Sequence, residues 1–313
     1  MPDEQAVSGH VFIATGENGL RLLSKDGINW THQATDREGV LLRHACFING
    51  RCVTAGRYGG DQLAWTTSDG LTWDKIKLDG RPYVTRVDFL FAESDHITAV
   101  VGEDGETPGA MTSTDGKTWS PRVPITADRK GMKHDAHLRR IASGNGRLVV
   151  IGDYGARLVR PADARLFQID QKASATDTLI DIAFGNGVFV GAGLHGLRMR
   201  SEDGFQWTDR VLGEEGEHIN AMIFDGKQFV GIGQGATYIS PDGKDWTRTP
   251  NENAPTSAVF GGGVYVGSLW PGKLLKSTDG IAWSQVHESP HHVLGFAYGR
   301  LAIDAAHGTL GTK

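Results

Sequence analysis

The residues of this chain that could bind a ligand are polar side chains inside short apolar runs. When seven such runs are aligned on the glycine turns that follow them, one position is polar in six of them: His44, Arg86, Arg140, Asp181, Asn220, Ser257 and Val293. A polar residue in an apolar strand requires a polar environment. Arg86 and Arg140 could form hydrogen bonds to a polar or small anionic ligand. This position therefore predicts a site for a polar or anionic small ligand, with a carbohydrate as one class.

Aromatic and basic residues of the connecting loops extend this set. Tyr58, Tyr154 and Trp270 can stack on a polar ligand while their polar atoms form hydrogen bonds. Other loop residues expected on the same side are Arg57, Asp61, Asp153, Arg157, His195, Arg198, Tyr238 and Lys273. The predicted ligand-binding residues are His44, Arg86, Arg140, Asp181, Asn220, Tyr58, Tyr154 and Trp270.

Histidines near the same strand ends suggest a second kind of site. A divalent metal ion could be held by imidazoles, which are good ligands for borderline metals, from His44, His137, His195, His218 and His292. The ion would activate a water or polarise a substrate oxygen, with Asp181 or Tyr154 as proton acceptor. The other reading is that each imidazole is a solvated loop residue, since neither H-x-H nor H-E-x-x-H occurs.

These residues must be positioned by a repeated unit, seen most clearly in residues 179–207. The unit holds an apolar run, an Asn-Gly turn, two further runs and an Asp-Gly turn that leads to a Trp, which is typical of four short antiparallel strands. The turn S-x-D-G-x-x-W, with Thr for Ser once, occurs six times, and a weaker seventh copy lies at 161–167. The Asp residues lie 37 to 48 residues apart. This period is the mark of a β-propeller blade.

The turns resemble the Asp-box, or bacterial neuraminidase repeat, of sialidase-like propellers and of several non-enzymatic propellers. In this chain Gly follows Asp directly and the Trp is four residues after Asp, whereas the usual pattern has one residue between Asp and Gly and the Trp five residues on. In that family the repeat is a structural device, so the resemblance implies an architecture and no activity. The early Phe/Tyr-Arg-Ile-Pro segment of sialidases is absent.

The repeats predict an all-β fold, a single seven-bladed propeller spanning residues 1–313. The first unit lacks an inner strand, and residues 293–298 match the missing piece, so the two termini should share one blade and close the ring. A run at 301–305 is left over, either as a competitor of the strand at 11–15 or as a fifth strand. The variable loops and the polar positions should lie on one side of the disc, where they surround either a ligand pocket or a water-filled channel.

The charge and hydropathy of the chain exclude some classes of partner. A net charge of −5 provides no basic field for nucleic acid, and no window reaches 18 uninterrupted apolar residues, so neither nucleic acid nor a membrane is an expected partner. The N-terminus lacks the features of a signal peptide, which predicts a cytoplasmic protein. Pairing across Asn49-Gly50 would place Cys46 and Cys52 on opposite faces of the sheet, so no disulfide is expected.

The leading interpretation is a binding module for a small polar ligand or glycan at the channel mouth. A metal-assisted lyase or hydrolase is one alternative, and a scaffold for protein assembly is the other.

Overall fold

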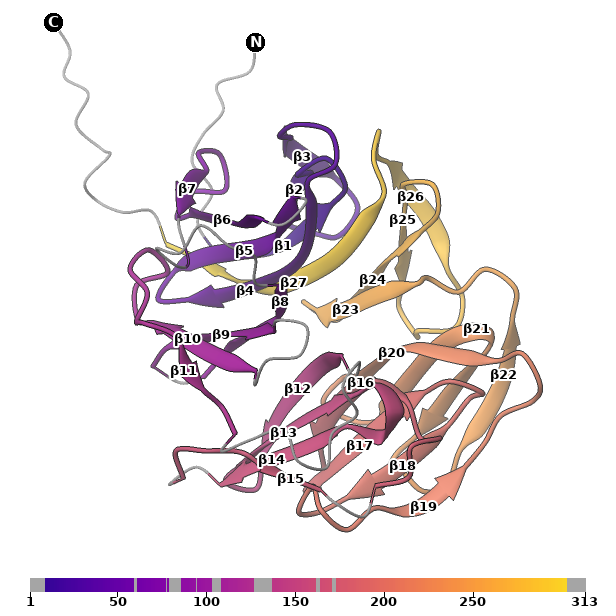
Figure 1. Ribbon diagram of the computed structural model, residues 1–313. Coiled ribbons are helices and arrows are strands. Elements are labelled where there is room, and N and C mark those ends of the chain that lie inside the picture. The colour runs from indigo at the N-terminus through magenta and orange to yellow at the C-terminus, as the bar shows by residue number, and fades with distance from the viewer. Residues whose placement is uncertain are drawn as a thin grey trace, which may run out of the picture.

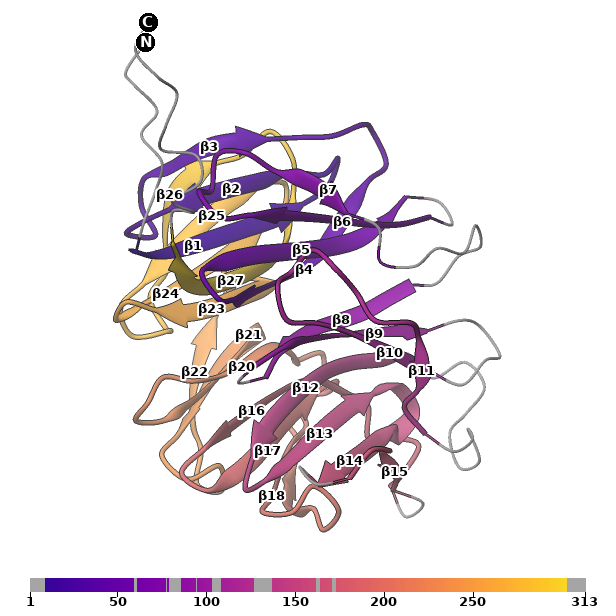
Figure 2. The same cartoon turned by 90° about the vertical axis from the view of Figure 1, so that its left-hand side faces the viewer.

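The computed structural model describes residues 9–58, 61–76, 78, 86–93, 95–102, 108–126, 137–161, 164–170 and 173–302. Seven antiparallel sheets surround a central axis, and the inner strand of each sheet contacts the inner strands of its two neighbours (Figures 1 and 2). The predicted seven-bladed propeller is confirmed. The described residues form no α-helix, and hence no helix that could cross a membrane.

The first four blades follow the chain, with the inner strand named first. Blade 1 consists of β27 (Val293–Leu301), β1 (Gly9–Gly16), β2 (Arg21–Ser24) and β3 (Trp30–Ala34). Blade 2 consists of β4 (Leu41–Ile48), β5 (Arg51–Tyr58), β6 (Asp61–Thr67) and β7 (Asp74–Ile76). Blade 3 consists of β8 (Arg86–Ala92), β9 (Ile97–Gly102), β10 (Gly109–Ser113) and β11 (Val123–Pro124). Blade 4 consists of β12 (Leu138–Gly144), β13 (Arg147–Gly152), the short 3-10 turn η1 (Asp153–Gly155), β14 (Arg157–Pro161) and β15 (Gln168–Ile169).

The remaining blades complete the ring. Blade 5 consists of β16 (Leu179–Gly185), β17 (Val188–Gly193), β18 (Arg198–Ser201) and β19 (Thr208–Val211). Blade 6 consists of β20 (His218–Phe224), β21 (Phe229–Ser240) and β22 (Thr247–Asn251), with β21 bending at Gly235 to serve as both middle strands. Blade 7 consists of β23 (Ser257–Gly261), β24 (Val264–Leu269), β25 (Lys273–Ser277) and β26 (Ser284–Glu288).

Blade 1 joins the two ends of the described chain, as the sequence predicted. β27 pairs with β1 along its whole length, from Gly9 opposite Leu301 to Gly16 opposite Val293 (Figure 1). The separate strand expected from residue 301 is wrong, because β27 continues without a break to Leu301; residues 303–305 lie outside the described residues. The expected pairing across Asn49-Gly50 is confirmed, and Cys46 and Cys52 are both free and buried.

The core lies between the blades. Apolar clusters fill each interface between neighbouring sheets, and every Trp of the six S/T-x-D-G-x-x-W turns packs in one of them. In blades 2, 4 and 5, an Asn of the turn between the first and second strands also contacts the next blade. Their side-chain amides donate to backbone carbonyls of the following Asp turn, in the pairs Asn49 with Thr114, Asn145 with Glu202 and Asn186 with Pro241.

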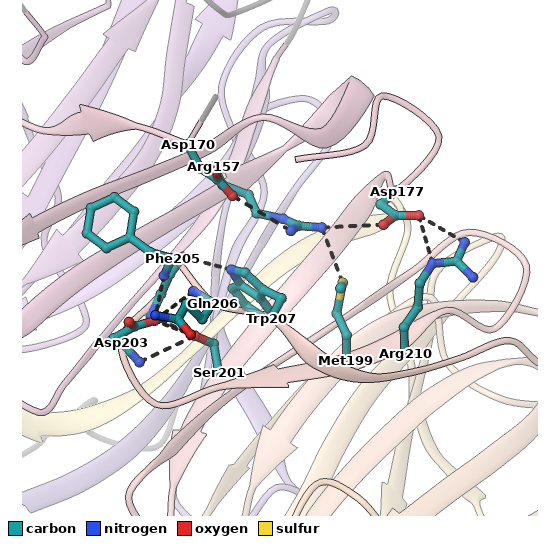
Figure 3. Close-up of polar contacts among 11 residues, drawn as sticks. Arg157, Asp170, Asp177, Met199, Ser201, Asp203, Phe205, Gln206, Trp207 and Arg210 are labelled. Carbon is teal, nitrogen blue, oxygen red and sulfur yellow. Dashed lines mark hydrogen bonds and ion pairs between the residues drawn. The ribbon is translucent and has the colours of Figure 1, made fainter. Parts of the chain in front are cut away.

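A buried arginine adds a polar tie between blades 4 and 5. Arg157 of β14 lies 5.0 Å from the ring centre of Trp207, and its guanidinium is 3.7 Å from Asp177 and 4.0 Å from Asp170 (Figure 3). Arg210 completes the group by donating two hydrogen bonds to Asp177. The sequence placed Arg157 in a loop of the mouth, and this is wrong because only 4% of its surface is exposed.

The prediction that Arg198 lies in a loop of the mouth is also wrong, because Arg198 is buried between blades 5 and 6. Its guanidinium stacks on Tyr238 at 3.8 Å from the ring centre, and only 5% of the residue is exposed. Glu217 accepts from the Tyr238 hydroxyl and from Arg248, so a carboxylate again lies beside an aromatic ring and a second arginine. Both arginines stabilise blade interfaces instead of lining the channel mouth.

Candidate functional site

A mouth cavity of about 410 Å³ opens on the side of the disc opposite the Asp turns. Its basic lining residues come from blades 2 and 4 and from the segment that enters blade 4: Arg43, His44, Arg57, His137, Arg139 and Arg140. Asp88 and Asp153 are the acidic lining residues. The connection at 127–136, which precedes His137, lies outside the described residues.

A bulge in the inner strands explains why adjacent residues of one strand reach the mouth cavity. In β4 the pairing passes from Leu42 opposite Gly56 to His44 opposite Ala55, so Arg43 is an extra residue without a partner. Such a residue turns its side chain away from the regular alternation of the strand. Gly56 permits this close approach, because a Cβ there would lie 1.8 Å from the Leu41 carbonyl oxygen.

The same shift recurs in five of the other six inner strands. The extra residues are Asp88 in β8, Arg139 in β12, Ile180 in β16, Asn220 in β20 and Leu294 in β27. All of these except Asn220 line the mouth cavity. β23 pairs with β24 without a shift. The bulges therefore form the upper ring of the site.

A second, inner cavity of about 190 Å³ lies next to the mouth cavity, with which it shares Arg43, His44 and Arg140. Six residues at its level each follow a bulge by one position: His44, Phe89, Arg140, Asp181, Ala221 and Gly295. Ser257 occupies the same level in β23, which has no bulge. Asn220 also lines it. Ala45, Leu90, Ile141 and Phe296 follow one residue further along their strands and give it an apolar lining below the polar ring.

The sequence alignment of this ring is therefore correct at four blades and wrong at three. His44, Arg140, Asp181 and Ser257 occupy equivalent positions. Arg86, Asn220 and Val293 precede the equivalent residues Phe89, Ala221 and Gly295. In the three misaligned strands the glycine does not follow in the same two-residue turn. The hairpin loops after β8 and β20 have four residues, between Ala92 and Ile97 and between Phe224 and Phe229, and Gly299 lies inside β27. The side chain of Arg86 lies outside the described residues.

The arginines of the mouth cavity repel one another. Burial lowers the pKa of Arg43, and the nearby cations Arg57 and Arg140 lower it further. Arg139 is neutralised by an ion pair with Asp153. Within the described part of the chain, neither Arg43 nor Arg57 has an ion-pair or hydrogen-bond partner of its own side chain. The cavity therefore holds more positive charge than the described residues neutralise.

His44 is neutral in this setting. Burial lowers its pKa to about 3, and the charges of Arg140 and Arg43 act in the same direction. A hydrogen bond to the backbone of Val87 opposes the shift. At neutral pH, His44 therefore adds no charge to the arginines around it.

Asp181 anchors Arg140 and joins two blades. Its carboxylate accepts hydrogen bonds of 2.9 Å from the amides of Ile182 and Met222, the second of which belongs to blade 6. Arg140 Nε lies 3.6 Å from Asp181, and Arg140 Nη1 donates to the Arg139 carbonyl. Burial raises the pKa of Asp181, while Arg140 and the two amides lower it.

The predicted aromatic residues do not line either cavity. Tyr58 lies under Arg37, whose guanidinium is 3.6 Å from the ring centre. Tyr154 is 42% exposed in η1, and Trp270 is 63% exposed with its ring edge against His292. The three side chains therefore lie outside both cavities.

The five predicted metal ligands are distributed over several places. His44 and His137 line the mouth cavity. His195 and His218 form a separate pair, in which the His195 amide donates to His218 Nδ1 at 3.1 Å, and His292 packs against Trp270. Among the residues that the structure describes, no three His, Cys, Asp or Glu side chains are grouped as a metal site.

Sequence reasoning missed Arg43, Asp88 and Arg139, which carry much of the charge of the mouth. The usable signal was the pair of adjacent polar residues, Arg43-His44 and Arg139-Arg140, early in an inner strand. Two consecutive polar residues break the alternation of a strand, and a bulge is the simplest way to turn both toward one cavity.

Comparisons with known proteins were consistent with the fold. The chain matches no protein-family model and no curated protein sequence. It is similar in structure to YCF48 bound to D1 peptide, with 14% identity and a TM-score of 0.59 over 85% of this chain and 91% of that chain. YCF48 from Cyanidioschyzon merolae gives 16% identity and a TM-score of 0.57, covering 82% and 87%. The computationally designed Ika8 protein gives 13% and 0.60, covering 93% and 88%. At these identities the likeness extends to the β-propeller fold alone.

Proposed function

We propose that this propeller is a binding module that holds an anionic ligand at the mouth of its channel. The observation that carries the proposal is the convergence of Arg43, Arg57 and Arg140 on one cavity, where burial and the charges of Arg57 and Arg140 lower the pKa of Arg43. An anion between them would replace repulsion by charge-assisted hydrogen bonds. A carboxylate suits the planar guanidinium groups because it can accept two parallel hydrogen bonds.

The volume of the mouth cavity is suited to a small ligand or to one segment of a larger ligand. The mouth cavity alone, at about 410 Å³, lies within the usual range for ligand pockets, about 300 to 1,000 Å³. Partial neutralisation by Asp153 and Asp181 limits the net charge of the ligand, so a single carboxylate fits better than a polyanion.

The test is calorimetric titration of the full chain with monocarboxylates, dicarboxylates and uronic acids at low salt. Arg57→Ala and Arg140→Ala should each weaken binding about tenfold, because hydrogen bonds to a charged group are worth about 1.5 to 3 kcal/mol. Arg165→Ala is the matched control, since Arg165 is exposed in an outer turn away from the cavity. Binding should also weaken as salt rises. Equal affinity of the two mouth variants and the control would contradict the proposal.

A protein partner is the second candidate. It is favoured by the structural neighbour that was solved with a peptide, and by the exposed rim residues Tyr154, Leu212 and Trp270. The six Ser/Thr-Asp turns resemble the Asp-box, which also occurs in propellers without enzymatic activity, and a role in protein binding is consistent with that resemblance. Co-purification of a partner that is lost in Arg140→Ala would place a peptide carboxylate in the mouth. A partner that is retained in Arg140→Ala would instead indicate scaffolding through another surface.

A further inference from the structure

The inner cavity is divided into two sides of different chemistry. Arg43, His44 and Arg140 come from blades 2 and 4 and include two cations. Asp181, Asn220 and Ser257 come from blades 5, 6 and 7 and offer oxygen acceptors. Since these blades follow one another around the ring, the cationic groups and the acceptors occupy two adjoining arcs of the same cavity, which meet where Arg140 Nε lies 3.6 Å from Asp181.

Two of the acceptors have no partner of their own. Within the described part of the chain, the amide of Asn220 and the hydroxyl of Ser257 make no side-chain hydrogen bond. Each oxygen of Asp181 accepts one backbone amide, and Oδ1 also lies 3.6 Å from Arg140 Nε, so Oδ2 is the oxygen with room for a second donor. This arc can therefore receive a group that donates several hydrogen bonds.

We infer that the two adjoining cavities bind a zwitterion, with its carboxylate at Arg43, Arg57 and Arg140 and its ammonium at Asp181, Asn220 and Ser257, as a free amino acid would present. This inference rests on the proposed function and specifies the ligand class of the same site. An ammonium has three donors and no acceptor, which matches an arc of one carboxylate, one amide oxygen and one hydroxyl. His44 does not oppose the ammonium, because burial keeps its imidazole neutral.

The spacing of the two rings also fits such a ligand. The bulge residue Arg43 precedes His44 by one position, and residues of a strand are about 3.3 Å apart along the axis. A carboxylate between Arg43 of the upper ring and Arg140, which is at the level of Asp181, thus lies within about one strand residue of that level. In an α-amino acid the two charged groups are attached to one carbon. The apolar residues below, including Ile141 and Phe296, would contact a side chain directed into the channel.

The test compares amino acids with acids that lack only the ammonium. Titrations at pH 7 would use L-alanine with propanoate, L-leucine with 4-methylpentanoate, and L-glutamate with glutarate. In at least one pair the amino acid should bind roughly tenfold tighter than its partner acid, since it gains hydrogen bonds between charged groups. Ser257→Ala and Asn220→Ala should reduce this ratio while leaving the affinity for the simple acid unchanged.

Four variants distinguish a lost ligand contact from a loss of stability. Ser257→Ala and Asn220→Ala remove no internal hydrogen bond of a described side chain, so the melting temperature should stay constant. Asp181→Asn should abolish the preference for the amino acid. Because this substitution also affects the hydrogen bond that Asp181 accepts from the Met222 amide, the melting temperature of the variant is measured in parallel. Arg57→Ala should weaken both members of a pair equally.

Each outcome is decisive. Equal binding of amino acids and simple acids would overturn the zwitterion inference and leave the anionic site intact. A preference that persists unchanged in the Ser257, Asn220 and Asp181 variants would also overturn it, because the ammonium would then lie elsewhere. Failure of every carboxylate, with or without an ammonium, would overturn the proposed function as well.

Discussion

The residues of the Asp turns show how local chemistry is encoded in a few adjacent positions. In the turn at 113–119, the Ser113 hydroxyl accepts from the Gly116 amide, and Asp115 accepts from the amides of Lys117 and Thr118. Five other turns repeat this arrangement, with Thr67 replacing Ser in one. Because every partner lies within three residues, the sequence alone predicts these hydrogen bonds.

The Asp turns should make stability depend on acidity. Hydrogen bonds, first from the Thr118 amide, lower the pKa of Asp115 to about 2, although burial opposes the shift. A carboxyl with a lowered pKa in the folded state stabilises the fold above its unfolded pKa of about 3.9, and this contribution is lost as pH falls toward 2. Melting temperature measured between pH 6 and pH 2 should therefore fall most steeply below pH 4.

Two substitutions test the assignment of this slope. Asp115→Asn keeps an oxygen acceptor but does not titrate, so it should flatten the acid limb of the curve. Asp245→Asn is the control, since Asp245 is exposed and its side chain accepts no hydrogen bond in the described part of the chain. A curve for Asp115→Asn that parallels the wild type would show that the acid sensitivity has another source.

The mouth arginines show the limit of reasoning from single residues. Arg43 and Arg139 reach the cavity only because their strands contain a bulge, and the bulge depends on the close approach of a facing glycine such as Gly56 or Gly152. That pairing joins residues more than ten positions apart. Alternation and turn motifs could therefore place His44, Arg140, Asp181 and Ser257, but they could not identify the extra residues next to them.

At the scale of elements, the strands of neighbouring blades are joined by buried charge as well as by apolar packing. Asp177 lies just before β16 and is 5% exposed, where it contacts Arg157 of blade 4 and Arg210 of blade 5 (Figure 3). The sequence predicted Arg157 at the mouth because it was expected in a loop on the side of the disc with the variable connections. Its burial depends on Trp207 and Asp177 of the next blade, which no local pattern reveals.

Asp177→Asn should destabilise the propeller by about 3 kcal/mol, measured by chemical denaturation. Removing one member of a buried ion pair leaves its partner charged and poorly solvated, which typically costs 3 to 5 kcal/mol. Here Asp170, 4.0 Å from Arg157, compensates in part, so the lower end is expected. Asp209→Asn is the control because it removes an ion pair with Arg200 at the surface of the same blade, and its effect should be much smaller. Equal losses would contradict a special role of the buried pair.

At the scale of the whole molecule, the ring was predictable because its repeats are regular and its first unit is visibly incomplete. The missing inner strand could be matched to residues near 293, since both share the polar-apolar pattern of the other inner strands. The exact end of that strand could not be predicted. β27 extends to Leu301 through pairing with β1, and an isolated sequence contains no signal for where such pairing stops.

Ring closure by β27 yields a prediction for the whole fold. Deleting residues 293–313 removes the inner strand of blade 1 and leaves the edge of β1 unpaired, with Val11, Ile13 and Phe12 losing part of their burial. Because blades 7 and 2 both pack on β27, the loss is not confined to one blade. The melting temperature should fall by roughly 10 °C or more, as expected for a loss of several kcal/mol.

The deletion can be distinguished from general damage by supplying the strand separately. A synthetic peptide of residues 290–302, added to the truncated chain, should pair with β1 and restore part of the melting temperature in a concentration-dependent manner. A peptide in which Val293, Ala297 and Leu301, all buried in the intact ring, are replaced by Asp should not do so. An unchanged melting temperature in the truncated chain would mean that blades 7 and 2 hold the ring without β27. Rescue by the native peptide but not by its substituted form would instead locate closure in the buried face of this one strand.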